Sequence, residues 1–293
     1  MGNVLRVAIF FACILLACSS LQPSPAEAYS FRVMLPILDS KNLPAYCFLP
    51  DYEIRQRLAG VVCGVGVGST KILQYHTHCQ MLANKGFFVV LIDPSNFPEQ
   101  LTPGPFSWDR MPGKLVADMN QVIVAGKLFF GYEWYLRAIL AAVNYLYYSP
   151  LVDPGKIAIS GFSQPANAAL TYACRDPRIK AIVWNYGGSP LILPYDPYKL
   201  PPVLIFHGTD DEVYDVKYAH SLAAELGSHN RDYEAHIYPG QRHMFNVRYE
   251  LESEDPTTNP IIMDSFRILI SFLYRKLFFA DILTGGPGRQ HRR

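Results

Sequence analysis

Short apolar runs alternate with stretches of helical periodicity along most of this sequence. The runs are rich in β-branched and aromatic residues, as is typical of strands buried on both faces of a sheet. They cover residues 60–63, 87–92, 156–160, 181–184 and 203–206. Apolar residues at helical spacing fill several of the intervals between them. This alternation predicts an α/β fold with a doubly wound, mostly parallel sheet flanked by helices, and it predicts a ligand site at the carboxyl ends of the strands.

No internal repeat or long linker divides the chain, so we interpret residues 29–280 as one domain. Within it, residues 94–133 fit the alternation least well, because five prolines precede an apolar stretch there. A long segment between a strand and its return helix lies where the strand ends, which makes 94–133 a candidate cap over the site. Residues 281–293 form a short basic tail, which we expect to be flexible.

The first 28 residues have the pattern of a secretory leader. Arg6 precedes an apolar run of 12 residues, from Val7 to Cys18. Such a run suits a signal peptide, whereas a membrane-spanning helix needs about 20 residues. Residues 26–28 (AEA) supply a cleavage site, so we expect a secreted or periplasmic protein. The alternative is a lipoprotein signal that ends before Cys18, which would leave a lipidated cysteine and a membrane tether.

Composition and charge restrict the partners of the chain. Half of the residues are hydrophobic, 17% are charged, and the formal net charge is +1. This composition supports a large buried core. Nucleic-acid binding requires a clustered basic face, and none is visible in the sequence outside the short tail. We therefore expect a small-molecule ligand and no nucleic-acid partner.

The stretch 156–170 (KIAISGFSQPANAAL) carries the strongest chemical signal. A buried strand ends at Gly161, a sharp turn contains Ser163, and a helix of small residues follows. This is the strand–turn–helix context of a nucleophile elbow, in which the serine hydroxyl stands above the edge of the sheet. A serine is a poor nucleophile at neutral pH, so it needs a histidine base and a carboxylate that orients the base.

Candidates for both partners follow downstream, each after an expected strand. Asp210 and Asp211 follow the run 203–206, and His243 follows the last expected strand. The chain order is therefore nucleophile, acid, histidine. Spacing alone leaves the choice between the two aspartates open.

The sequence resembles the dienelactone hydrolase branch of the α/β-hydrolases from about residue 46 to residue 274. The resemblance rests on segments 61–64 (VVCG), 82–87 (LANKGF), 152–157 (VDPGKI), 186–188 (YGG), 207–211 (HGTDD) and 243–245 (HMF). It implies the α/β-hydrolase fold, cofactor-free hydrolysis of an ester, lactone or thioester, and Asp211 as the acid. Members of the branch proper use cysteine at the elbow, so their particular lactone substrate is not carried over.

The resemblance also assigns an oxyanion hole, with two departures from the family pattern. Backbone N–H groups of Gln164 and Val65 are the expected donors. Pro165 stands where the elbow has its second glycine, and a proline disfavours helical angles at the residue before it. Cys63 stands where the family usually has histidine.

We predict no metal site and no cofactor. His76 and His78 lie two residues apart on an expected helix and so point to different faces. The glycines of 60–68 lack the spacing and acidic residue of a dinucleotide-binding loop. Outside the leader, Cys47, Cys63, Cys79 and Cys174 can either pair as disulfides or remain buried thiols, and the sequence leaves this choice open.

Together these observations predict a serine hydrolase with Ser163, Asp211 and His243 as its catalytic triad. Two alternatives stay open. A serine peptidase would use the same residues, and a catalytically silent binding protein would keep the fold and lose the chemistry, as the changes at Pro165 and Cys63 could indicate.

Overall fold

The computed structural model describes residues 30–37, 41–66, 72–92, 134–189, 194–247 and 255–279. The expected leader (1–28), cap (94–133) and tail (281–293) lie outside the described residues. Among those residues, no helix has the length and apolar character needed to cross a membrane.

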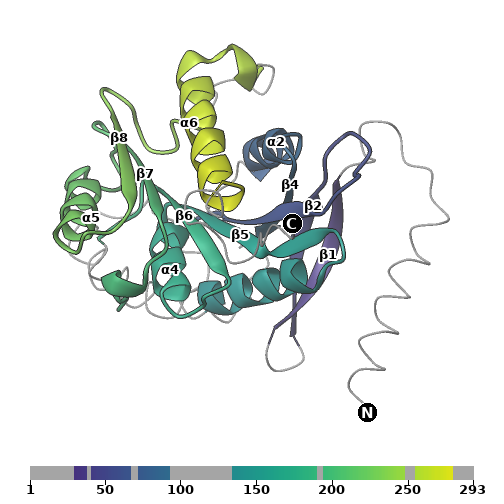
Figure 1. The fold of residues 1–293 in the computed structure, drawn as a ribbon. Coiled ribbons are helices and arrows are strands. Elements are labelled where there is room, and N and C mark those ends of the chain that lie inside the picture. Colours follow the sequence, from purple (N-terminus) through teal and green to yellow (C-terminus); the bar gives the residue numbers. More distant parts are fainter. Residues whose placement is uncertain are drawn as a thin grey trace, which may run out of the picture.

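An eight-stranded sheet in the order β1-β2-β4-β3-β5-β6-β7-β8 forms the centre of the molecule (Figure 1). The strands are β1 Ser30–Ile37, β2 Lys41–Phe48, β3 Leu58–Gly64, β4 Phe87–Ile92, β5 Val152–Phe162, β6 Ile179–Asn185, β7 Val203–Gly208 and β8 Tyr233–Tyr238. The pairs β1–β2 and β2–β4 are antiparallel, and all the others are parallel. The predicted fold class is confirmed. The sheet also contains an antiparallel hairpin, β1–β2, at one edge, which the sequence did not predict.

Helices cover both faces of the sheet. They are α2 Ile72–Ala83, a helix at 134–148, α4 Gln164–Ala173, α5 Lys217–Ser228 and α6 Pro260–Leu277. Helices α2 and α6 share one hydrophobic core with the sheet, while 134–148, α4 and α5 share the other (Figure 1). Neighbouring residues of a strand alternate between the two cores: Val61 packs on one face of the sheet and Val62 on the other.

The central strands are apolar throughout because both of their faces are covered. Every residue of β3, β4 and β7 is buried. Their carboxyl ends therefore form a rigid edge, and the loops that leave this edge carry the polar residues of the site.

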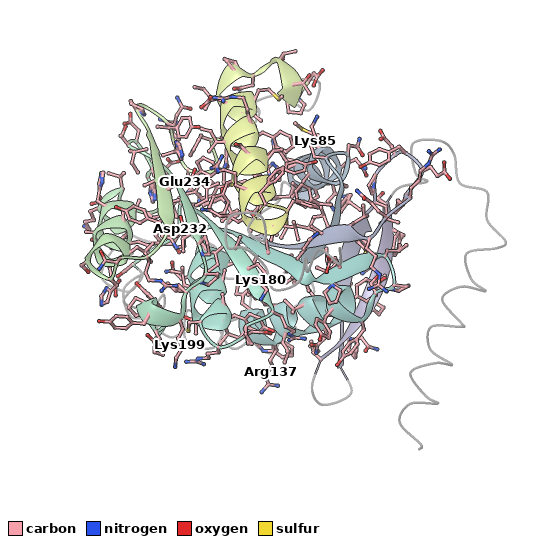
Figure 2. The ribbon with its side chains drawn as sticks, in the orientation of Figure 1. Lys85, Arg137, Lys180, Lys199, Asp232 and Glu234 are labelled. Atoms are coloured by element: carbon pink, nitrogen blue, oxygen red, sulfur yellow. The ribbon has the colours of Figure 1, made fainter. Side chains whose placement is uncertain are left out.

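Ion pairs link β8, the edge strand opposite β1, to α6. Arg275 contacts Glu234 at 2.7 Å, and Lys276 contacts Asp232 at 2.6 Å. Asp232 and Glu234 lie at the start of β8 (Figure 2). These pairs are partly exposed, so each adds little to stability, about 0–1 kcal/mol.

Candidate active site

Ser163 occupies a strained turn between β5 and α4. Its φ of 65° and ψ of −128° lie in a region that residues with a side chain rarely adopt. The turn is tight: a Cβ at Gly161 would lie 2.5 Å from Ala166 Cα and 2.6 Å from the Pro165 carbonyl oxygen. Only glycine fits at this position. The backbone therefore holds the serine at the carboxyl edge in the geometry expected for an elbow.

Helix α4 begins at Gln164, and Pro165 is its second residue. The bias of Pro165 against helical angles at Gln164 does not prevent the helix from beginning there. A proline is tolerated in the first helical turn because its missing N–H would have no partner there. Its ring also packs at the end of β3, since a Cβ at Gly64 would lie 3.0 Å from Pro165 Cβ.

Asn185, at the end of β6, holds the Ser163 turn through hydrogen bonds. Its carbonyl oxygen accepts a hydrogen bond from Ser163 N at 2.9 Å, and its Nδ2 donates to the Gly161 carbonyl at 3.0 Å. Asn246 Nδ2 donates to Asn185 Oδ1 at 2.9 Å. Neither asparagine was expected at the site from the sequence. The available signal was an amide residue at the end of an otherwise apolar strand.

Asp211 lies in the loop after β7, and both of its carboxylate oxygens accept hydrogen bonds. Oδ1 accepts the N–H groups of Val213 and Tyr214, each at 2.8 Å. Oδ2 accepts Nδ1–H of His243 at 2.7 Å. Its side chain is fully buried. Asp211, and not the exposed Asp210, thus contacts the histidine, which is the choice that the resemblance favoured.

His243 contacts both partners at once. In the tautomer that these contacts require, Nδ1–H donates to Asp211 and Nε2 accepts the Ser163 hydroxyl at 3.1 Å. The histidine loop crosses directly over the end of β7, where a Cβ at Gly208 would lie 2.0 Å from the Gln241 carbonyl oxygen. The structure therefore brings together three residues that the sequence spreads over 81 positions.

A second histidine, His207, reaches the same carboxylate. Its Nε2–H donates to the Tyr214 carbonyl at 2.8 Å and lies 3.3 Å from Asp211 Oδ2. Burial alone would raise the pKa of Asp211. The hydrogen bonds from His207, His243 and the Tyr214 N–H outweigh burial and hold that pKa well below its usual range. Asp211 is therefore ionised and can stabilise a positive charge on His243.

Of the two expected oxyanion donors, Gln164 directly follows the serine, whereas Val65 follows a strand on the opposite side of β5 from β7, which leads to Asp211. Gln164 N begins α4, and Val65 follows β3, the neighbour of β5. A Cβ at Gly66 would lie 3.2 Å from Ser163 Cβ, so the β3 loop touches the nucleophile turn. Val65 itself is fixed by the hydroxyl of Tyr135, which donates to its carbonyl at 2.8 Å.

The cysteines that the structure describes are all free thiols, and all are buried. Burial raises the pKa of Cys47 to about 12 and that of Cys79 well above its usual value. Cys63 lies in the same hydrophobic core as Cys79 and contributes to that rise. The structure thus corresponds to the buried-thiol alternative, with Cys63 as part of a core and not of the site.

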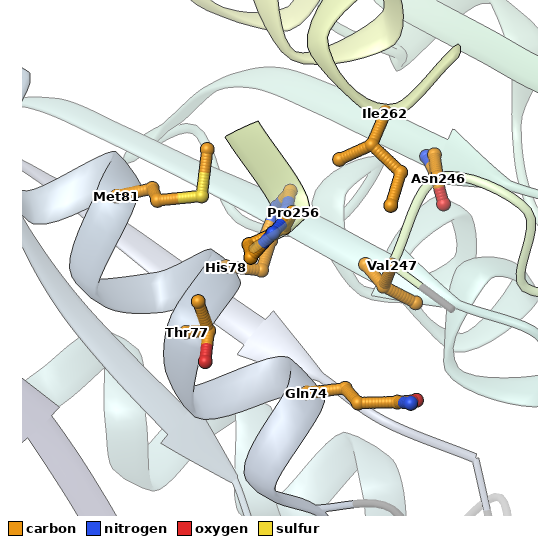
Figure 3. Close-up of a pocket in the computed structure, with 8 residues that line it drawn as sticks. All are labelled: Gln74, Thr77, His78, Met81, Asn246, Val247, Pro256 and Ile262. Atoms are coloured by element: carbon orange, nitrogen blue, oxygen red, sulfur yellow. The ribbon is translucent and has the colours of Figure 1, made fainter. Parts of the chain in front are cut away.

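His78 faces a small cavity between α2 and the loop after His243 (Figure 3). The cavity measures about 10 Å³, close to the space of one water molecule. It is lined by Gln74, Thr77, His78, Met81, Asn246, Val247, Pro256 and Ile262. Burial lowers the pKa of His78 to about 4, so this imidazole is neutral. His76 instead packs on Tyr46 and Phe48. No group of three metal-ligating side chains occurs within the part of the chain that the structure describes.

A parallel sheet with a nucleophile turn after one strand, an acid after another and a histidine after the last is the arrangement of the α/β-hydrolases. The sequence profile of the dienelactone hydrolase family matches residues 43–260. The chain belongs to this family of hydrolases. A Yersinia pestis protein named "Putative carboxymethylenebutenolidase" is 32% identical over 106 residues, which cover 33% of this chain and 40% of that protein. The match therefore spans well under two thirds of this relative.

Solved structures with the same fold include both short and long chains. A "Putative Dienelactone Hydrolase" from Klebsiella pneumoniae has a TM-score of 0.56 and 18% identity, over 84% of this chain and 98% of that one. Esterase 2 of Thermogutta terrifontis, phosphorylated by paraoxon, has a TM-score of 0.56 and 19% identity over 87% and 97%. The acylaminoacyl peptidase of Pyrococcus horikoshii has a TM-score of 0.60 and 15% identity, over 85% of this chain and 42% of the peptidase. At these identities the likeness concerns the fold alone.

Proposed function

We propose that this protein is a serine hydrolase that cleaves carboxylic esters, with lactones and thioesters as related substrates, through an acyl-enzyme intermediate. The observation that carries the proposal is an unbroken series of contacts. Ser163 Oγ lies 3.1 Å from His243 Nε2, and His243 Nδ1 lies 2.7 Å from Asp211 Oδ2. Both distances lie within the range needed for proton transfer and for orientation of the base.

In the proposed reaction, Ser163 Oγ attacks the acyl carbon while His243 Nε2 takes its proton. Buried Asp211 stabilises the imidazolium that forms. The N–H groups of Gln164 and Val65 hydrogen-bond to the oxyanion, and each such donor typically contributes about 2.7–4 kcal/mol. When the intermediate collapses, the bond to the alcohol oxygen breaks and His243 returns the proton to it. Water then repeats the sequence and releases the acid.

Backbone strain favours this proposal over the silent binding protein. A non-glycine residue at positive φ typically costs about 1–3 kcal/mol and is usually retained where it has a function. Ser163 keeps this conformation, and the carboxylate behind its histidine is saturated with hydrogen bonds. A scaffold that only binds would gain nothing from either feature.

Covalent labelling with a fluorophosphonate or paraoxon tests the assignment. We expect stoichiometric labelling of the wild type and none of Ser163→Ala, with hydrolysis of p-nitrophenyl esters lowered at least 10³-fold. Ser228→Ala is the matched control, because Ser228 lies at the exposed end of α5. A folded wild type that neither labels nor hydrolyses would favour the binding protein. Faster turnover of an acyl p-nitroanilide than of the matching ester would favour the peptidase.

We also propose that the protein is exported, from the pattern of residues 1–28. N-terminal sequencing of protein recovered from expressing cells tests this. A mature chain that begins at Tyr29 would support secretion, and a blocked, acylated Cys18 would support the lipid anchor. An intact N-terminus in the cytosolic fraction would contradict export.

A further inference from the structure

Tyr214 is fixed to the proposed triad through its backbone. Its N–H donates to Asp211 Oδ1 at 2.8 Å, and its carbonyl accepts Nε2–H of His207 at 2.8 Å. These bonds leave the residue little freedom to move relative to the acid. The side chain of Tyr214 is thus held in a defined place beside the site.

The ring of Tyr214 lies between His243 and the loop after β6. Its centroid is 5.8 Å from that of the His243 ring, at an interplanar angle of 69°. A Cβ at Gly188 would lie 2.9 Å from Tyr214 Cε1, so the ring packs directly on this glycine. Burial raises the pKa of the phenol, and hydrogen bonding to the Ser163 side chain opposes that rise. The ring therefore stands directly beside the histidine of the proposed triad, and its hydroxyl keeps its proton at neutral pH.

The side on which Tyr214 approaches determines which part of a substrate it meets. Strand β3, which leads to the Val65–Gly66 oxyanion loop, pairs with one side of β5. Tyr214 follows β7, which lies on the other side, beyond β6. An oxygen bound by the oxyanion donors would point away from Tyr214. The leaving oxygen must instead lie near His243 Nε2, which returns the proton to it.

We propose that the Tyr214 hydroxyl donates a hydrogen bond to the leaving-group oxygen of the ester and so assists its departure. This inference rests on the proposed hydrolase function. The alcohol oxygen takes the bonding electron pair as the C–O bond breaks, and its proton comes from His243. Tyr214 stabilises the developing negative charge without giving up its own proton. This assistance matters most for esters of alcohols that leave poorly, such as simple alkyl esters.

Tyr214→Phe tests this with esters of one acid and alcohols of rising pKa, namely p-nitrophenyl, phenyl and ethyl acetate. We expect kcat/KM to fall about tenfold on the ethyl ester and less than threefold on the p-nitrophenyl ester. Nitrophenolate leaves without assistance, so log kcat/KM should depend more steeply on leaving-group pKa in the variant. Tyr238→Phe is the matched control. It removes a hydroxyl that donates to Asp264 at 2.8 Å, outside the contacts that link Ser163, His243 and Asp211.

The outcomes separate the two proposals. An equal loss on all three esters, or no loss on any, would overturn the role of Tyr214. Fluorophosphonate labelling of the variant provides the check on the nucleophile, since Ser163, His243 and Asp211 are unchanged and the label should still reach one group per chain. A wild type that hydrolyses none of the esters and resists labelling would refute the proposed function itself.

Discussion

Asp211 and Asp176 are two hydrogen-bonded carboxylates at opposite ends of the same sheet. Asp211 follows β7 at the carboxyl edge, whereas Asp176 precedes β6 at the amino edge. Asp176 accepts Arg178 Nη2 at 2.6 Å and Nε at 2.9 Å, and it also accepts the hydroxyl of Tyr172. Burial opposes ionisation of Asp176, but these hydrogen bonds hold its pKa below the usual value. Ionised carboxylates with good partners thus occur at both edges.

The two edges differ in what surrounds the carboxylate. Arg178 extends the network of Asp176 to Asn144, on the helix at 134–148, so it joins neighbouring elements. The network of Asp211 ends on a strained serine. Of the four non-glycine residues at positive φ that the structure describes, Ser163, Tyr186 and Met244 lie at the carboxyl edge. The fourth, Asn230, is of a type that tolerates this conformation. An ionised, hydrogen-bonded carboxylate occurs at both edges. The candidate active site differs because a residue with a strained backbone, Ser163, lies at the end of its network.

The largest expected contrast is in activity. Asp211→Asn should lower kcat by about 10⁴-fold, because an amide cannot hold His243 in the required tautomer. Asp176→Asn should leave kcat/KM within about threefold and lower the free energy of unfolding by roughly 1–2 kcal/mol, since its partners are partly exposed. Steady-state kinetics and urea denaturation of both variants measure the two effects. Equal losses of activity would remove the distinction between the edges.

Two glycines of β5 compare the packing at the two edges of the sheet: Gly161 lies next to the Ser163 turn, and Gly155 lies near the start of the strand. Gly161→Ala should cost about 3 kcal/mol of stability and at least 10²-fold in kcat/KM, because its Cβ would meet the backbone of α4 at 2.5 Å. Gly155→Ala, on the same strand, meets only the Asp153 side chain at 3.3 Å and should change stability by less than about 0.5 kcal/mol. Thermal unfolding and ester hydrolysis test the pair. If the Gly161→Ala variant keeps its stability and activity, α4 must be able to move away from the end of β5.

The sequence predicted the central strands well, because a buried parallel strand is apolar on both faces. The run 87–92 coincides with β4, and the helix expected around His76 and His78 corresponds to α2. The hairpin of β1 and β2 was not predicted. Strand β1 is an edge strand with mostly exposed or half-buried residues, and a proline interrupts each strand of the pair. An edge strand lacks the continuous apolar pattern on which the prediction depended.

For the site, chain order and strand ends located Ser163, Asp211 and His243, because motif context carries that information. The residues around them were not predictable in the same way. Asn185, His207 and Tyr214 act through contacts across β6, β7 and their loops, and no spacing in the sequence indicates such contacts. Glu212, the residue after Asp211, accepts a long hydrogen bond from His243 N at 3.4 Å. Motif context indicated the three side chains that meet at the carboxyl edge, whereas packing determines which other groups contact them.

The smallest expected effect concerns acid stability. Asp211 has a folded-state pKa well below its unfolded value of about 3.9, so its stabilising contribution is complete above about pH 5. Below that, the unfolded chain binds the proton first, and the contribution falls toward the folded pKa. The difference in unfolding free energy between wild type and Asp211→Asn should therefore shrink by about 1 kcal/mol from pH 7 to pH 3. Asp176→Asn should show the same sign with a smaller change. Urea denaturation followed by circular dichroism at both pH values measures these differences. If the difference in unfolding free energy between the wild type and Asp211→Asn is the same at both pH values, the Asp211 carboxylate has the same pKa in the folded and unfolded chains.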